Sequence, residues 1–215
     1  MSLIVGYIDE KNKMYYIAGD SAITLSEYTK NTLSNNKVFR AKDHPEILVG
    51  VVGDFKYVGL FANAPLFDGY DPNFTKQDEQ VFMADVVSRR MHKCIREDDR
   101  FNLNGEKPQF QMLVVTKNAI YDFDNDFSTA TYTDPWASIG SGWFCASTAL
   151  YAMQNYEAQI PVKLTIAIYG TSKYISGISA PISILSEPFE FSDATKKKRV
   201  DAEINEKVTL TDSLD

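Results

Sequence analysis

The start of the chain holds the residue whose chemistry depends most on its position. Ser2 follows Met1, and a small second residue is the usual condition for removal of the initiator methionine, which would leave Ser2 with a free α-amine. A serine hydroxyl is a poor nucleophile unless a neighbouring base accepts its proton. An α-amine has a reference pKa of about 7.7–8.0, so it can act as that base near pH 7. The sequence therefore offers a hydroxyl and its base on one residue.

Residue types that bind metals or form disulfides are scarce in this sequence. It contains two cysteines, Cys94 and Cys145, and two histidines, His44 in an expected loop and His92 in an expected helix. None of them stands at the spacing of a zinc site or a redox motif. We therefore expect no metal and no cofactor, and we interpret both cysteines as buried structural thiols.

The charge balance limits the classes of partner. The formal net charge is -7 and the isoelectric point is about 4.9. Nucleic-acid binding needs concentrated Lys and Arg, and residues 196–199 form only one short basic cluster, which we interpret as a solvated turn of a C-terminal helix. No apolar stretch approaches the roughly 20 residues of a membrane span, and no secretory signal pattern is present. These features predict a cytoplasmic protein without nucleic-acid or membrane partners.

The first element expected in the chain is a β-hairpin. Residues 3–8 and 14–18 are β-type runs, and a polar turn at residues 9–13 joins them. Chain termini usually fray unless a sheet ties them down. A strand that begins at residue 3 would therefore tie down the N-terminus and Ser2 with it.

The rest of the chain alternates runs of strands with runs of helices. Strands are expected at residues 37–39, 47–52, 110–116, 119–123 and 180–191. Helices are expected from Phe55, with Asp54 as N-cap, and at residues 77–96, 144–156 and 162–174. Loops are expected at residues 21–36, with short extended pieces inside it, and at residues 64–74 and 137–142. This order predicts an α+β fold with two stacked sheets and outer helix pairs, formed by a single domain at 1–191 with a charged tail at 192–215.

Five short motifs share their order and spacing with a known family. They are Ser2-Leu3-Ile4-Val5-Gly6, Ile17-Ala18-Gly19-Asp20-Ser21, Lys37-Val38-Phe39, Val49-Gly50-Val51-Val52-Gly53-Asp54 and Ile139-Gly140-Ser141-Gly142. Together they resemble the proteasome β-type family of N-terminal-nucleophile (Ntn) hydrolases, which includes the HslV peptidase. The resemblance extends over most of the first 155 residues and implies a four-layer αββα sandwich.

The resemblance also implies a role for each matching residue. Ser2 would be the nucleophile, and its own α-amine would be the base. Lys37 would lower the pKa of that amine, and Asp20 would hold Lys37 in place. Gly50 would donate its backbone N–H to the oxyanion, and Ser141 would orient the α-amine.

The last part of the family's site lies after the fourth helix. The family usually has an Asp there, followed three residues later by a Ser-Gly pair. Ser176 supplies the serine, whereas Lys173 stands in the place of the Asp. Trp143 also stands where a small residue is usual.

Three functions remain open from the sequence. The resemblance implies a peptidase subunit that cleaves peptides or unfolded proteins, assembles into a homo-oligomeric ring or stack, and works with an ATP-dependent unfoldase if it has such a partner. Lys173 and Trp143 favour a second interpretation, a catalytically inactive proteasome-like scaffold. An Ntn amidohydrolase acting on a small amide ranks last, because such enzymes more often begin with Cys.

Overall fold

The computed structural model describes residues 2–26, 29–32, 37–98, 107–190 and 207–208. The first half contains β1 (Leu3–Asp9), β2 (Met14–Asp20), β3 (Ala22–Ser26), β4 (Thr29–Thr32), β5 (Val38–Arg40), β6 (Leu48–Gly53), α1 (Phe55–Asn63), α2 (Lys76–Val81), η1 (Phe82–Val87) and α3 (Ser88–Glu97). The second half contains β7 (Phe110–Val115), β8 (Ile120–Phe123), β9 (Thr129–Thr131), β10 (Trp136–Gly140), α4 (Trp143–Ala152), α5 (Ile160–Ser172), β11 (Ile182–Pro188) and β12 (Lys207–Val208).

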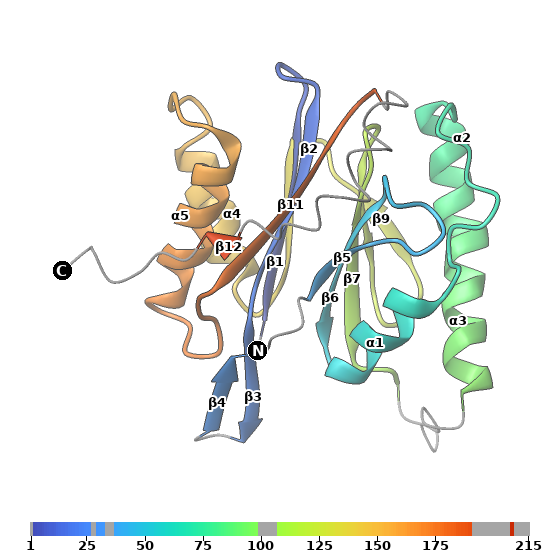
Figure 1. The fold of residues 1–215 in the computed structure, drawn as a ribbon, viewed down its shortest axis with the longest axis horizontal. Coiled ribbons are helices and arrows are strands. Elements are labelled where there is room, and N and C mark those ends of the chain that lie inside the picture. The colour runs from blue at the N-terminus through green and yellow to red at the C-terminus, as the bar shows by residue number, and fades with distance from the viewer. Residues whose placement is uncertain (1, 27–28, 33–36, 99–106, 191–206, 209–215) are drawn as a thin grey trace.

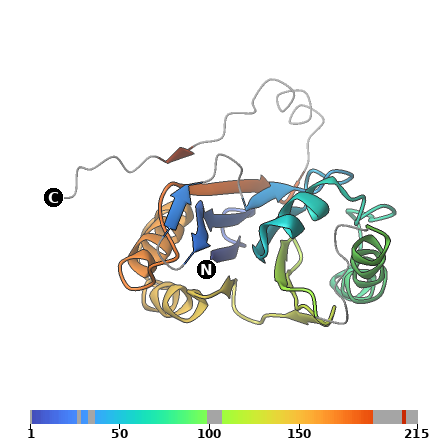
Figure 2. The same cartoon turned by 90° about the horizontal axis from the view of Figure 1, so that it is seen from below.

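These elements form four layers, which confirms the predicted αββα sandwich. One five-stranded sheet has the order β10-β1-β2-β11-β12, and the other has the order β5-β6-β7-β8-β9. Helices α4 and α5 cover the outer face of the first sheet, and α1 to α3 cover the second (Figure 1). Figure 2 shows the same helix layers at the two sides, seen from the end of the sandwich that carries the N-terminus.

The alternation of side chains along each strand explains why the sheets stack. In β1, Leu3 and Val5 face the α4–α5 layer, whereas Ile4 and Ile8 face the second sheet. Successive residues of a strand point to opposite faces, so a central strand with apolar residues on both faces must be covered twice. Three apolar clusters follow, one between the sheets and one under each helix layer.

The expected N-terminal hairpin is present and lies in the middle of its sheet. Strand β1 pairs with β2 on one side and with β10 on the other. Leu3 is opposite Gly140, and Ile4 is opposite both Ile139 and Gly19. The start of the chain is therefore held from both sides, immediately after Ser2.

Two predicted elements need correction. Residues 137–142 were expected to form a loop, but Trp136–Gly140 is strand β10 and only Ser141 and Gly142 turn toward α4. Its small residues suit a strand that α4 covers closely, because the Ser138 hydroxyl lies 2.8 Å from the Trp143 carbonyl and donates to it. The helix expected at residues 77–96 exists, but its middle, Phe82–Val87, is a π-helical turn rather than α-helix.

Three further expectations have mixed outcomes. Asp54 occupies the N-cap position of α1, but its side chain makes no capping hydrogen bond. Cys94 and Cys145 are free thiols as expected, although both are half-buried rather than buried. The basic cluster at 196–199 lies outside the described residues, and of the tail only Lys207–Val208 is described, as strand β12.

Neither a membrane span nor a metal cluster is found in the described part of the chain. None of its helices is both long and apolar enough to cross a bilayer. In the same residues no three His, Cys, Asp or Glu side chains gather in an arrangement that would hold a metal ion.

Candidate active site

A buried ion pair lies beside the start of the chain. The Lys37 ammonium lies 3.0 and 3.1 Å from the two carboxylate oxygens of Asp20. The side chain of Lys37 is 4% exposed and that of Asp20 is fully buried. Asp20 ends β2 and Lys37 directly precedes β5, so the pair joins the two sheets at one end of the sandwich. Desolvating two charges is costly, and an oppositely charged partner with further hydrogen bonds offsets that cost.

The Asp20 carboxylate also fixes the backbone next to Ser2. Its Oδ1 accepts a hydrogen bond from the Leu3 backbone N–H at 2.9 Å. Its Oδ2 accepts one from the Ala22 N–H at 3.0 Å. The pair with Lys37 is therefore tied to the peptide that immediately follows Ser2, and a positive charge is held close to the first strand.

The turn between β10 and α4 holds Ser2 from the other side. The Ser141 hydroxyl donates to the Ser2 carbonyl at 3.3 Å. Gly140 has φ +92°, and a Cβ at this position would lie 2.2 Å from the Ser2 carbonyl oxygen. A side chain there would collide with the backbone of Ser2, so only glycine permits this approach. Ser2 itself is buried.

The structure places Gly50 inside the sheet rather than at its end. Gly50 is opposite Val38 of β5 and Leu113 of β7. The Val51 N–H donates to the Lys37 carbonyl at 3.0 Å. Because successive N–H groups alternate between the edges of a strand, the Gly50 N–H points toward β7. A Cβ on Gly50 would lie 2.7 Å from Ile4 Cγ2, so this glycine allows β6 to pack closely on β1.

A second glycine, Gly53, ends the same strand. Gly53 is exposed and has φ +101°. N–H groups two residues apart in a strand point to the same edge. The Gly53 N–H therefore points to the edge of β6 at which the Val51 N–H bonds to Lys37. The preceding residue, Val52, lies 3.3 Å from the Cβ position of Gly140, which itself contacts Ser2. The Gly53 N–H therefore points away from β7, unlike that of Gly50, the glycine that we predicted.

Ser176 is not brought to this site by any contact found among the described residues. It is exposed in the turn that follows α5. The contact between that loop and the site comes from Ser179, whose carbonyl accepts a hydrogen bond from the Ser21 N–H at 3.3 Å. The Lys173 ammonium lies over the Tyr169 ring, 4.5 Å from its centroid. Ser176 remains a prediction without a geometric link to Ser2.

Comparison with known proteins gives structural but no sequence matches. No family model and no curated protein matches the chain. Among solved structures, Thiobacillus denitrificans BPH in complex with epoxomicin matches with a TM-score of 0.68 and 15% identity, over 87% of this chain and 100% of that chain. Eukaryotic HslV from Trypanosoma brucei matches with a TM-score of 0.65 and 18% identity, over 86% and 99% of the two chains. Anbu, an ancestral β-subunit from Yersinia bercovieri, matches at 0.59 and 13%, over 87% and 83%.

The chain has the fold of the proteasome β-type, HslV-like subunits. Identities of 13 to 18% establish the fold alone. Within that fold the structure brings together four of the six predicted residues, namely Ser2, Asp20, Lys37 and Ser141, through the contacts described above.

Two residues that contribute to this end of the proteasome-type fold were not predicted as site residues. Gly140 and Gly53 both adopt positive φ, and both appear in the sequence motifs that carry the family resemblance. A glycine directly after an apolar strand is the signal that could have indicated them, because positive φ at a strand end favours glycine.

Trp143 does not pack into the candidate site around Ser2. Its side chain begins α4, is 54% exposed, and lies edge-on against Phe144 with ring centroids 5.7 Å apart. The bulk of this residue is thus directed to the surface of the helix layer.

Proposed function

We propose that the chain is a proteasome-like peptidase subunit that cleaves peptide bonds with Ser2 as an N-terminal nucleophile after removal of Met1. The observation that carries the proposal is the buried Asp20–Lys37 pair, which is hydrogen-bonded to the backbone immediately after Ser2. Burying two charges beside the N-terminus carries a desolvation cost, and such buried charged groups are common at functional sites.

The α-amine of Ser2 would act as the base. A neighbouring ammonium disfavours a second positive charge, so Lys37 would lower the pKa of the amine and keep it neutral near pH 7. The amine would take the proton of the Ser2 hydroxyl as Oγ attacks the carbonyl carbon of the substrate. The same proton would then pass to the leaving amine as the peptide C–N bond breaks. Water would hydrolyse the resulting ester and restore Ser2.

The negative charge of the tetrahedral intermediate needs a backbone donor. We propose Gly53 as this donor instead of Gly50, because by strand alternation the Gly50 N–H is directed at β7, whereas that of Gly53 is directed to the edge at which Val51 bonds to Lys37. Ser141 would orient Ser2 through the hydrogen bond to its carbonyl.

The wider context of the activity is also part of the proposal. The substrates would be peptides or unfolded proteins in the cytoplasm. The outer side of the α4–α5 layer exposes large apolar residues, which supports assembly into a homo-oligomeric ring or stack; they are Trp143, Phe144, Tyr151, Val162 and Ile166. An ATP-dependent unfoldase would be the partner that delivers folded substrates.

Intact mass followed by reaction with a peptide epoxyketone tests the nucleophile. The epoxyketone offers two electrophilic carbons, so it can capture the hydroxyl and the free α-amine of the same N-terminal residue. We expect a mass that lacks Met1 and a single adduct on Ser2. The Lys37→Met variant should lose at least about tenfold in adduct formation, because its amine would hold a proton near pH 7.

The Arg40–Glu187 pair provides a matched control. It is also an ion pair between the sheets, with Arg40 Nε 2.9 Å from Glu187 Oε1. Arg40 is at the last position of β5, whereas Lys37 directly precedes the first. Arg40→Met should destabilise the fold as Lys37→Met does, by about 3 kcal/mol, yet it should keep the adduct. Equal loss of the adduct in both variants would mean that Lys37 acts through stability alone.

Retention of Met1, or a free Ser2 that never reacts, would favour a catalytically inactive scaffold. The observation on its side is the loop after α5, where Ser176 is exposed and Lys173 packs on Tyr169.

A further inference from the structure

A cavity opens at the end of the sandwich opposite Ser2. Its volume is about 400 Å³, which is within the range of small-molecule sites. Tyr15 and Ile47 line it, near the starts of β2 and β6, whereas Asp20 and Gly53 end those same strands at the Ser2 site. Asp20 follows Tyr15 by five positions, so the two places are about 17 Å apart along β2 at roughly 3.3 Å per residue.

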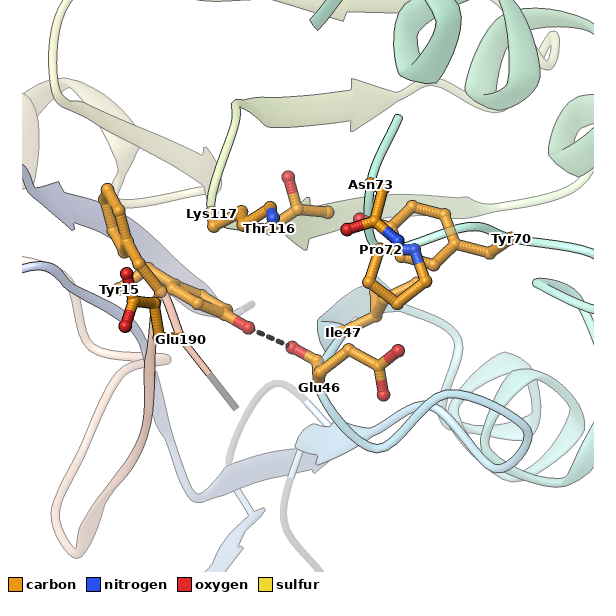
Figure 3. Close-up of a pocket in the computed structure, with 10 residues that line it drawn as sticks. Tyr15, Glu46, Ile47, Tyr70, Pro72, Asn73, Thr116, Lys117 and Glu190 are labelled. Atoms are coloured by element: carbon orange, nitrogen blue, oxygen red, sulfur yellow. Dashed lines mark hydrogen bonds between the residues drawn. The ribbon is translucent and has the colours of Figure 1, made fainter. Parts of the chain in front are cut away.

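Aromatic rings form two opposing walls of this cavity (Figure 3). On one side the Tyr15 hydroxyl donates to the Glu46 carbonyl at 2.6 Å, and the Tyr15 and Phe189 ring centroids are 6.2 Å apart. On the other side the Tyr70 ring is held by edge contacts with Phe74 at 5.8 Å and with His44 at 5.3 Å. The walls are therefore fixed before any ligand arrives, which reduces the entropic cost of binding.

Acidic residues outnumber basic residues in the lining of the cavity. Glu46 and Glu190 line it, and Lys117 is the basic residue in its lining. The Lys117 charge also acts on the buried carboxyl of Glu79. Burial raises the pKa of the Tyr70 hydroxyl well above its usual range, and nearby Glu79 and Glu46 raise it further.

We propose that this cavity binds an organic cation, the guanidinium group of an arginine side chain or of an arginine-like small molecule. A guanidinium group is planar, is weakly hydrated and stacks on aromatic faces. The rings of Tyr15, Phe189 and Tyr70 in the cavity lining would provide such faces. The guanidinium charge would be balanced by Glu190 and by Glu46, whose Oε1 already lies 2.9 Å from His44 Nδ1. The chain already places one cation against this aromatic wall, because the Lys13 ammonium lies 5.4 Å from the Phe189 centroid.

This site goes beyond the proposed peptidase activity and does not depend on it. Because β2 and β6 run from the cavity to the Ser2 end, occupancy at one end can be tested for an effect at the other.

Calorimetric titration of the whole protein with acetyl-arginine methylamide tests the proposal. Acetyl-citrulline methylamide is the matched neutral probe, because it has nearly the same shape without the charge. We expect saturable binding of the arginine probe, and at least about tenfold weaker binding of the citrulline probe. Free arginine and a short arginine peptide, compared in the same way, distinguish a small-molecule ligand from a side chain of a partner.

Variants place the binding in this cavity. Glu46→Gln and Phe189→Ala should each weaken the arginine probe by about five- to tenfold, whereas Tyr15→Phe, which keeps the ring, should bind within about twofold of wild type. Lys37→Met, at the Ser2 end, should leave the affinity unchanged. Circular dichroism confirms that each variant is folded. Equal affinity for the two probes, no saturation at about 10 mM, or wild-type binding by both Glu46→Gln and Phe189→Ala would overturn the inference.

Discussion

Individual buried carboxyl groups in this chain are stabilised in different ways. Asp20 is paired with Lys37, and Glu187 is paired with Arg40. Glu79 is fully buried and bonds instead to the Asn118 amide, and its Oε1 has no hydrogen-bond partner among the described residues. Burial raises the pKa of Glu79 above its ordinary value, and hydrogen bonds from Thr116 and Asn118 offset part of that rise. The charged form of Glu79 is therefore disfavoured in the folded state.

The raised pKa of Glu79 predicts a loss of stability as pH rises. In the unfolded chain its proton leaves near the ordinary value of 4.5, but in the folded chain it is held to higher pH. Between these two pKa values the folded state binds more protons, so the free energy of unfolding falls as pH increases, with a slope of up to about 1.4 kcal/mol per pH unit. Glu79→Gln should flatten this slope from pH 4.5 upward in urea unfolding series.

A second carboxyl provides an independent check of that sign. Burial also raises the pKa of Asp122, partly offset by a hydrogen bond from Tyr132. Asp122→Asn should therefore reduce the same slope, and the double variant should reduce it further. A Glu79→Gln protein whose stability follows the wild-type pH dependence would contradict the prediction.

At the scale of elements, the sequence predicted the strands that alternate and missed those built from small residues. The first hairpin and β7–β8 follow alternating or continuous apolar runs and were located within two residues. Strand β10 was expected to be a loop, because Ala137, Ser138 and Gly140 carry little apolar surface and only the cover of α4 explains them. The sequence did not indicate the π-helical turn, because apolar residues keep roughly the spacing of an α-helix along it.

The candidate site was predictable where motifs place charges, and less so where backbone geometry decides. Asp20, Lys37 and Ser141 are brought to Ser2 because each stands at the end of an element in the sequence motifs. The choice between Gly50 and Gly53 depends on which edge of β6 each N–H faces, and that direction follows from the pairing register, which the sequence alone does not reveal.

The turn that joins β10 to α4 should tolerate no side chain at Gly140. Gly140 has φ +92° and an added Cβ would lie 2.2 Å from the Ser2 carbonyl oxygen, so Gly140→Ala combines backbone strain with a collision. We expect it to lower the free energy of unfolding by about 2 kcal/mol or more. Gly59→Ala is the control, because Gly59 lies in α1 with no atom within 4 Å of its Cβ position, and it should stabilise by about 0.5–1 kcal/mol. Equal effects in chemical unfolding would show that the turn can relax.

At the scale of the whole molecule, the two helix layers differ in what they present outward. Helices α4 and α5 bury one side on the first sheet and still expose Phe144 and Tyr151, at 66% and 65%, and Val162 and Ile166, both at 47%. On the other layer Val81 of α2 is exposed at 63%. Several large apolar side chains exposed on one helix layer indicate an interface, whereas a single exposed valine does not.

The α4–α5 surface should therefore carry the contact between copies of the chain. The double variant Phe144→Glu with Ile166→Glu places one charge on each helix of this surface, and desolvating the charges on assembly would cost more than the lost apolar contact alone. Light scattering after gel filtration should show the wild type as a multimer of the 24.2 kDa chain and the double variant shifted toward one chain. Val81→Glu, on the opposite helix layer, should assemble as the wild type does. A monomeric wild type, or a double variant that assembles fully, would mean that this apolar surface serves another contact.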